Sequence, residues 1–229
     1  MTVHRFFVAP DDAVGDRFPL PASIERQVQR VLRLRDGDRL VLLTGDGRAA
    51  TCRLEDGACV VERRDAAGGE PAHRLTIIQA LLRGDGLETV IRQGTEIGVA
   101  AFRLVVTERC VARDLSPRRL DRLRAIAREA AEQSERGTVP PIDRPGPLAT
   151  ELTPGRVLLA ARDGATRLAV IEPPAALIVG PEGGFTPSEL AAASEARVPF
   201  AWLGPRILRA ETVAIAAAAV TLSRTGDFA

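Results

Sequence analysis

The chain contains no lysine, no asparagine and no tyrosine among its 229 residues. All 31 basic side chains are therefore arginine. The missing residue types have codons poor in G and C, so a GC-rich genome explains their absence. The absences still have chemical consequences, because they exclude a lysine nucleophile, a tyrosine acid and the lysine of a phosphate-binding loop. Guanidinium groups remain available for two-point contacts with phosphate.

Cysteine and histidine are scarce, and neither residue type forms a recognisable site. Cys52, Cys59 and Cys110 lack a CxxC spacing, which argues against both a disulfide framework and a zinc site, so we expect free thiols. His4 and His73 lie far apart in the sequence without a metal-ligating neighbour. We therefore expect structural roles for both histidines and no bound metal.

Neither a long apolar run nor an excess of one charge is present. No apolar stretch reaches the length of a membrane span, and Asp11, Asp12 and Asp16 interrupt the first twenty residues. We therefore expect a cytoplasmic protein with no membrane partner. The 31 basic residues are balanced by 30 acidic ones, so any contact with RNA must come from local clusters of arginine.

Turn residues and periodicity divide the chain into two predicted domains. Residues 1–68 contain short strand-like segments separated by tight glycine turns, which predicts a small β-barrel, and residues 21–35 read as a helix that covers it. The polar, glycine-rich stretch 65–70 predicts a flexible linker. The second domain is then expected over residues 72–229.

In the second domain, predicted strands alternate with predicted helices. This pattern is typical of an α/β fold with a mostly parallel sheet that is covered on both faces. Asp85 with Glu88 matches a capping box, and Thr186 with Glu189 matches another that has proline at the first helical position. The last predicted helix, 211–223, is rich in alanine, so it can approach another backbone closely.

Two glycine-rich turns are the most informative feature of the sequence. One apolar run ends in Gly180-Pro181-Glu182-Gly183-Gly184, and a later run, 200–203, ends in a second turn that begins at Gly204 and contains Arg206 and Arg209. Glycine lets the main chain approach a ligand closely, and each turn precedes a predicted helix. The first turn is neither GxGxxG nor GxxxxGK[ST], so we do not expect a dinucleotide or a nucleoside triphosphate.

Taken together, LIVGPEGGF (177–185) and LGPRILRAET (203–212) resemble the paired signature of the ribosomal RNA small subunit methyltransferase E family. That family methylates N3 of uridine 1498 in 16S ribosomal RNA and belongs to the SPOUT methyltransferases. Further segments are similar to the family in order and spacing: RFFV (5–8), RVLRLRDGD (30–38), QGTEIG (93–98), TER (107–109) and EAAEQSER (129–136).

The resemblance implies both a fold and a cofactor. It implies a C-terminal SPOUT α/β trefoil knot with a mostly parallel sheet, and an N-terminal PUA-like β-barrel domain that binds RNA. The cofactor would be S-adenosylmethionine, held by main-chain groups and apolar side chains of three loops. The implied cofactor-binding residues are Leu159, Ala160, Gly180, Pro181, Glu182, Gly183, Gly184, Leu203, Gly204, Ile207, Leu208 and Arg209.

The implied reaction moves a methyl group from a sulfonium to a ring nitrogen that carries a proton. Arg209 is the candidate to stabilise negative charge on the uracil carbonyls, and Glu211 or Glu182 is the candidate to accept the proton. Structural alternatives stay open for both carboxylates. Glu211 suits the first turn of a helix because of the helix dipole, and Glu182 can serve only to shape its turn.

The implied partners are 16S ribosomal RNA in the small subunit and a second copy of the chain bound through the knot. Candidate RNA contacts are Arg5, Arg30, Arg33, Arg35 and Arg136, and further arginines lie along the predicted helix that begins near Pro117. Two other functions stay open: a SPOUT methyltransferase acting on a ribose 2′-hydroxyl or another base, and an RNA-binding ribosome-assembly module without turnover.

Overall fold

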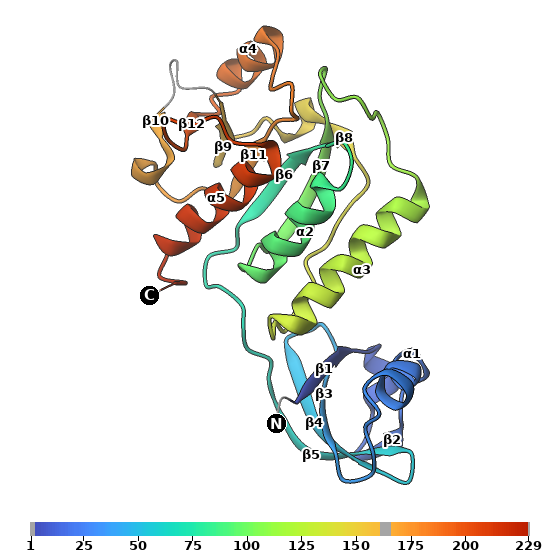
Figure 1. Ribbon diagram of the computed structural model, residues 1–229. Coiled ribbons are helices and arrows are strands. Elements are labelled where there is room, and N and C mark those ends of the chain that lie inside the picture. The colour runs from blue at the N-terminus through green and yellow to red at the C-terminus, as the bar shows by residue number, and fades with distance from the viewer. Residues whose placement is uncertain (1–2, 161–165, 229) are drawn as a thin grey trace. The chain divides into compact units, whose positions relative to one another are not determined.

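The computed structural model describes residues 3–160 and 166–228, which form two compact units. The first unit comprises Met1–Glu70 together with Ala131–Val139, and the second comprises Pro71–Ala130 together with Pro140–Ala229. Figure 1 shows the strands of each unit gathered into a sheet of their own. Each unit is described separately below.

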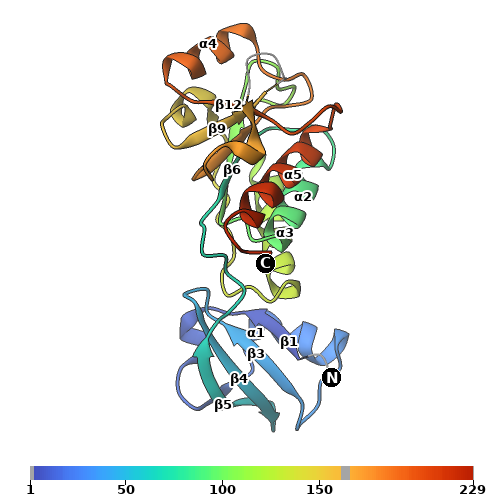
Figure 2. The same cartoon turned by 90° about the vertical axis from the view of Figure 1, so that its left-hand side faces the viewer.

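The first unit is a curved sheet of five strands with the order β1-β3-β4-β5-β2 (Figure 2). The strands are β1 (His4–Phe7), β2 (Arg17–Pro19), β3 (Arg39–Leu43), β4 (Arg48–Glu55) and β5 (Ala58–Ala66). β1 pairs with β3 in parallel, and the other pairs are antiparallel. The predicted helix divides into α1 (Ala22–Arg26) and a π-helical turn, η2 (Gln27–Val31), while η1 (Pro10–Ala13) is a 3₁₀ turn. Phe6, Val28 and Leu42 are buried in its core, which also contains Cys52 and Cys59.

The first unit also contains a segment that lies far along the sequence. Ala131 is fully buried in a cluster with Phe7 and Leu43. The side chain of Arg136 is 2% exposed and donates to the Glu70 carboxylate at 2.7 Å. Partial burial opposes ionisation of Glu70, but the hydrogen bonds and attraction from Arg136 outweigh it and lower the pKa of this carboxyl. The stretch 65–70 is therefore an anchored segment that begins inside β5, and the prediction of a flexible linker was wrong.

The second unit contains a seven-stranded sheet in which every pairing is parallel. Its order is β10-β12-β9-β11-β6-β7-β8. The strands are β6 (Thr76–Ala80), β7 (Ala101–Val106), β8 (Gly146–Pro147), β9 (Arg156–Leu159), β10 (Thr166–Arg167), β11 (Ala176–Val179) and β12 (Phe200–Trp202). β11 is buried along its whole length, as its apolar sequence predicts.

Parallel strands need crossover connections, and the helices of the second unit lie in these connections. They are α2 (Gly86–Glu96), α3 (Pro117–Gln133), α4 (Pro187–Glu195) and α5 (Ala210–Ser223), with 3₁₀ turns η3 (Leu148–Glu151) and η4 (Leu168–Val170). The end of α3 belongs to the first unit. α2 and α5 lie side by side (Figures 1 and 2). The predicted fold class, an α/β sheet preceded by a β-barrel, is confirmed.

The two predicted capping boxes have different outcomes. At α4, the Thr186 side chain accepts a hydrogen bond from the Glu189 main chain, and the Glu189 side chain accepts one from Thr186, which confirms the prediction. At α2, Asp85 occupies the N-cap position but makes no side-chain capping bond, so that prediction was wrong. Glu88 instead accepts two hydrogen bonds from Arg122, at 2.8 and 2.9 Å. These bonds lower the pKa of the Glu88 carboxyl and raise that of Arg122.

Across residues 3–160 and 166–228, no helix combines the length and the apolar character that crossing a bilayer requires.

Candidate active site

Four adjacent strands of the second unit end at one edge of its sheet. β12, β9, β11 and β6 are consecutive neighbours and parallel, so the loops that follow them emerge together. A cavity of about 710 Å³ lies there, which is within the usual range of about 300–1,000 Å³ for small-molecule sites. The loop expected after Ala160 falls in 161–165, outside the described residues.

Both glycine turns contribute to this cavity. Of the residues expected to form the site, the following line it: Leu159, Gly180, Pro181, Glu182, Gly184, Ile207, Leu208, Arg209 and Glu211. Ala160, Gly183, Leu203 and Gly204 belong to the same loops but are not among the lining residues. Two turns that are separate in the sequence therefore form one site.

Other lining residues were not expected from the sequence. They are Arg83, Asp85, Gly86, Val179, Phe185, Ala210 and Val213. Arg83, Asp85 and Gly86 follow β6, which pairs with β11 in parallel. The signal that was available is positional: loops after neighbouring parallel strands meet at the carboxyl edge of the sheet. Assigning β6 as the neighbour of β11 would have placed Arg83 and Asp85 beside the first glycine turn.

The first glycine turn is fixed by contacts from two other loops. The Glu182 carboxylate accepts a hydrogen bond from the Arg83 main-chain N–H at 2.9 Å. The Arg109 guanidinium donates to the Gly183 carbonyl at 2.8 Å. Within the turn, the Gly184 N–H donates to the Pro181 carbonyl at 2.9 Å. The turn is therefore held in place before any ligand arrives.

The helix that follows this turn is tied to the same neighbouring loop. The buried Glu189 carboxylate accepts hydrogen bonds from the main-chain N–H groups of Thr186 and Glu108, each at 2.8 Å. The Ser188 hydroxyl donates to the Glu108 carboxylate at 2.8 Å. The segment Thr107-Glu108-Arg109 thus has a structural role: it anchors both the glycine turn and the start of α4.

A buried polar group lies close to the first turn. The Gln79 side chain is fully buried, and its Nε2 donates to the carbonyls of Val179 and Gly180 at 3.4 Å each. Its Oε1 has no hydrogen-bond partner among the described residues. A buried acceptor without a donor is destabilising. The Gln79 side chain thus supports the base of the first turn, and it is not itself among the residues that line the cavity.

The second glycine turn has a different environment. No hydrogen bond joins residues 203–208 to any other residue within 3–160 or 166–228. Ile207 is completely exposed although it lines the cavity, and Leu208 is half-buried. Gly204 has φ +132°, a conformation that favours glycine. This turn therefore presents apolar side chains without hydrogen bonds to the rest of the described chain.

The charged side chains around the cavity differ in whether they have hydrogen-bond or ion-pair partners within the described structure. The guanidinium groups of Arg83 and Arg209 are exposed and have no hydrogen-bond or ion-pair partner among the described residues. Glu211 lies in the first turn of α5 and is half-buried. The Glu182 carboxylate is engaged by a main-chain donor, which agrees with the alternative that it shapes the turn.

The arginines expected to contact RNA fall into two groups. Arg30, Arg33 and Arg35 are exposed and have no side-chain partner among the described residues. Arg5, in contrast, forms an ion pair with Glu135 at 2.8 Å. Arg136 is buried against Glu70, so its side chain offers no surface for RNA and instead stabilises the first unit.

Arginines on the strands and on α3 are mostly engaged within their own unit. Arg39 and Arg53 both bind Glu62, at 2.7 and 3.2 Å. Hydrogen bonding to Arg39 is the main reason why the pKa of the Glu62 carboxyl lies below its usual value. On α3, Arg119 donates to the Gly84 carbonyl at 2.7 Å, and Arg124 donates to the Ile142 carbonyl at 3.1 Å. Arg30, Arg33 and Arg35 near η2 therefore differ from these engaged arginines of the strands and α3.

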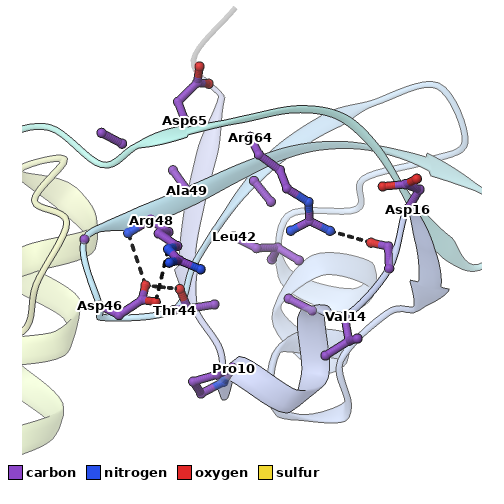
Figure 3. Close-up of a pocket in the computed structure, with 15 residues that line it drawn as sticks. Pro10, Val14, Asp16, Leu42, Thr44, Asp46, Arg48, Ala49, Arg64 and Asp65 are labelled. Atoms are coloured by element: carbon purple, nitrogen blue, oxygen red, sulfur yellow. Dashed lines mark hydrogen bonds and ion pairs between the residues drawn. The ribbon is translucent and has the colours of Figure 1, made fainter.

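The first unit has a cavity of its own, of about 970 Å³, between η1 and the strands (Figure 3). Its charged side chains are engaged internally. Arg64 donates to the Gly15 carbonyl, and the Asp46 carboxylate accepts from the Thr44 hydroxyl and from the Arg48 main chain. The hydrogen bond from Thr44 is the main reason why the pKa of the Asp46 carboxyl is lowered. These contacts hold the turn after β3. Because they are internal to the unit, we assign no function to this cavity.

Comparison with known proteins gives a consistent result. A family model described as an RNA methyltransferase domain matches residues 69–222, and one described as an RNA methyltransferase PUA domain matches residues 28–61. A ribosomal RNA small subunit methyltransferase E from Mycobacterium bovis is 37% identical over 221 residues, covering 86% of this chain and 80% of the relative. The predicted PUA-like character of the first unit is confirmed.

Two solved structures are similar over nearly the whole chain. A ribosomal RNA small subunit methyltransferase E from Neisseria gonorrhoeae, bound to S-adenosyl methionine, has a TM-score of 0.88 at 32% identity and covers 97% of this chain and 98% of its own. A putative methyltransferase from Legionella pneumophila, in complex with the cofactor SAM, has a TM-score of 0.86 at 26% identity and covers 98% of each chain. The chain thus belongs to the ribosomal RNA small subunit methyltransferase E family.

Proposed function

We propose that this chain transfers a methyl group from S-adenosylmethionine to N3 of a uridine in 16S ribosomal RNA of the small subunit. Membership of the family establishes the coarser activity, methylation of ribosomal RNA. The position of the methyl group is the finer part of the proposal. One observation carries it: both glycine turns meet at a single cavity that Arg209 lines with a partner-free guanidinium group.

The residues present fit the methyl donor. The glycines of the first turn leave the main chain accessible, and a side chain at Gly180 would place its Cβ 3.0 Å from the Phe185 ring. Leu159, Leu208 and the exposed Ile207 supply apolar surface for a flat adenine ring. When bound, S-adenosylmethionine supplies an electrophilic methyl group on its sulfonium. The protein then acts mainly by positioning the two reactants.

Arg209 would act on the nucleobase. Removal of the N3 proton leaves negative charge shared by the two uracil carbonyl oxygens, and a guanidinium group beside them stabilises that charge. Arg209 is the N-cap residue of α5, makes no side-chain capping bond and lines the cavity. Its charge is therefore available to a substrate.

Product analysis tests this function directly. We expect wild-type protein to transfer labelled methyl groups from S-adenosylmethionine to unmethylated small subunits or to 16S RNA, with 3-methyluridine as the product identified by mass spectrometry. A 2′-O-methylated ribose or another methylated base would overturn the N3 assignment. Donor binding without any transfer would instead support a non-catalytic assembly module.

Two arginines of the second glycine turn provide a matched pair. Arg209→Ala should lower the rate of methyl transfer by about 10²- to 10³-fold, as expected when a charge-stabilising group is removed. Arg206→Ala should have a much smaller effect, because Arg206 is also exposed but does not line the cavity. Equal losses in both variants would contradict the role assigned to Arg209.

We propose that RNA binds the first unit near η2. Arg30, Arg33 and Arg35 are the predicted contacts that the fold leaves unpaired, whereas Arg5 and Arg136 are engaged by carboxylates. Each phosphate contact contributes to the salt dependence of affinity. Arg33→Gln should therefore reduce the slope of log K against log salt by about 0.7 for single-stranded RNA. An unchanged slope would exclude this surface.

We also propose a homodimer formed through the second unit. α2 and α5 border a shallow groove of about 370 Å³ that is lined by Thr89, Gln93, Glu211, Thr212, Ile215, Ala216 and Ala219. Its small side chains allow the close approach of another backbone, as the alanine-rich sequence of α5 indicates. Analytical ultracentrifugation at micromolar concentration should detect a dimer, and a monomer would exclude this proposal.

A further inference from the structure

The loop after β6 contributes Arg83, Asp85 and Gly86 to the lining of the cavity, and three hydrogen bonds hold its main chain. The Arg83 N–H donates to Glu182, and the Leu81 N–H donates to the Val105 carbonyl at 3.0 Å. The Gly84 carbonyl accepts from Arg119 at 2.7 Å. With its main chain held in this way, the loop presents the side chains of Arg83 and Asp85 at the cavity.

Asp85 occupies a position where the fold would ordinarily use its carboxylate. Aspartate is among the preferred N-cap residues because its side chain accepts a hydrogen bond from the first turn of the helix. Asp85 is the N-cap residue of α2, yet it makes no such bond. It is exposed and has no side-chain partner among the described residues. Its carboxylate thus remains available at the cavity.

Three carboxylates among the described residues line the cavity, and they are not equivalent. Glu182 accepts a main-chain hydrogen bond from Arg83. Glu211 lines both this cavity and the groove between α2 and α5. Asp85 lines the cavity but not the groove, and its side chain has no partner among the described residues. Of these three described carboxylates, Asp85 is therefore the one best placed to react with a substrate.

The chemistry of uridine supplies a task for such a group. N3 carries a proton and lies between two carbonyl oxygens, so its recognition needs one acceptor flanked by donors. We propose that Asp85 accepts the N3 proton of the target uridine and that Arg83 donates hydrogen bonds to an adjacent carbonyl oxygen of the same base. This assignment rests on the proposed N3 methylation, which it extends by naming the general base.

The step balances without another reactant. The N3–H bond breaks, the proton passes to the Asp85 carboxylate, and the electron pair stays on N3. The resulting negative charge is shared by the two carbonyl oxygens, where Arg83 and Arg209 stabilise it. The N3 electron pair then forms the N–CH₃ bond while the C–S bond breaks and its pair stays on sulfur. Asp85 afterwards releases its proton to water.

The order of these events suits a base at the exposed edge of the cavity. In the deprotonated ring, the N3 electron pair points along the direction in which the proton left. Proton removal must therefore be completed before the methyl group occupies that direction. Asp85 lies on an exposed loop, so it can deprotonate the base as the nucleotide enters and need not remain beside N3 during transfer.

Asp85→Asn in the full-length protein tests the proposal. Asparagine is as good an N-cap residue as aspartate, so we expect the thermal stability to be unchanged. Under single-turnover conditions with small-subunit RNA near neutral pH, the rate of 3-methyluridine formation should fall by about 10²- to 10⁴-fold. Asp143→Asn is the matched control, because Asp143 is an exposed aspartate of the same unit that does not line the cavity. It should behave like wild type.

A chemically altered substrate separates proton transfer from a structural role. RNA with 5-fluorouridine at the target position has a more acidic N3–H, so it depends less on a base. Asp85→Asn should recover a large part of the wild-type rate on this RNA, and its rate on ordinary RNA should rise steeply with pH. A structural defect would produce neither rescue.

The possible outcomes distinguish this proposal from the function on which it rests. If wild type forms 3-methyluridine and Asp85→Asn forms it at a similar rate, the assignment of Asp85 is overturned while the proposed function stands. A greater loss in Glu211→Gln, or no rescue by 5-fluorouridine, would also overturn it. If wild type forms no 3-methyluridine, both proposals fail together.

Discussion

The two glycine turns resemble each other in sequence but differ in how the fold supports them. The turn at 180–184 is fixed by Arg83, by Arg109 and by its own internal hydrogen bond. The turn at 203–208 has no hydrogen bond to any described residue, and Ile207 at its centre is fully exposed. One side of the cavity is therefore held by hydrogen bonds, while the other side has none to the described residues.

This difference predicts whether a change in each turn affects the folding stability, the affinity for the donor, or both. A change in the anchored turn should affect both the folding stability and the affinity for the donor, because the same contacts serve both. A change in the unsupported turn should affect affinity alone.

The largest loss of folding stability should come from a change outside both turns. This variant serves as the reference for a protein that is destabilised without a change in donor affinity. Glu70→Gln removes the carboxylate that forms an ion pair with the buried Arg136 guanidinium. Breaking a buried ion pair costs about 3–5 kcal/mol of unfolding free energy, and the partial exposure of Glu70 places the expected loss near the lower end. Urea denaturation measures the loss, and calorimetry below the unfolding range should find donor affinity unchanged.

The Glu70 variant also carries a pH prediction. The folded-state pKa of Glu70 is lowered from its ordinary value of 4.5. Its ionised form therefore contributes full stability above about pH 4.5, and this contribution is lost as the pH falls through the folded-state pKa. The stability gap between wild type and Glu70→Gln should narrow as the pH falls below that value. A gap that widens in acid would contradict this interpretation of the pair.

Gly183→Val should come next, with effects on both stability and binding. A Cβ at Gly183 would lie 3.2 Å from the Arg109 Cβ, so the larger valine side chain must displace the arginine that holds the turn. Overpacking of this kind costs about 1–3 kcal/mol. If most of that cost falls on the donor-binding form, affinity should weaken about 5- to 150-fold in calorimetry. Normal affinity would show that the anchor is not required.

Ile207→Ala should affect binding without affecting stability. The side chain is fully exposed, so its loss should change the unfolding free energy by less than about 0.5 kcal/mol. Burial of an isoleucine side chain against a ligand contributes about 1.5–3 kcal/mol, of which alanine retains a part. We therefore expect donor affinity to fall about tenfold at an unchanged melting temperature. A lower melting temperature would indicate that the second turn is also supported by the fold.

Glu182→Gln should have the smallest effect. Glutamine keeps an oxygen that can accept the Arg83 N–H, so the anchor survives in a weaker, uncharged form. Methyl transfer should stay within about tenfold of wild type. A loss of 10²-fold or more at unchanged donor affinity would identify Glu182 as the proton acceptor and would contradict its structural role.

Much of this site could be predicted from the sequence because its two main segments carry local signals. An apolar strand followed by glycine, and a threonine cap followed by proline and glutamate, define the first turn and α4 without knowledge of the rest of the fold. The family resemblance then joined the two turns. The threading of a knot has no such local signal, since spacing and periodicity do not record which loop a chain passes through.

The residues that were missed depend on contacts between distant segments. Arg83 and Asp85 reach the cavity because β6 pairs with β11, and sequence periodicity does not specify strand order. Asp85 was expected to cap α2, but Arg122 takes the glutamate of that capping box. Arg136 was expected to contact RNA, yet its side chain is buried and pairs with Glu70, from a stretch that was expected to be flexible.

The segment 131–139 has a consequence for how the protein is made. It completes the first unit, with Ala131 and Arg136 buried there, but it lies more than sixty residues beyond Glu70. Because synthesis proceeds from the N-terminus, the strands β1–β5 leave the ribosome before the helix end that finishes their core. The nascent N-terminal unit must wait for part of the second unit to be translated. A fragment that stops at residue 70 should accordingly fold poorly, although every strand of its sheet is present.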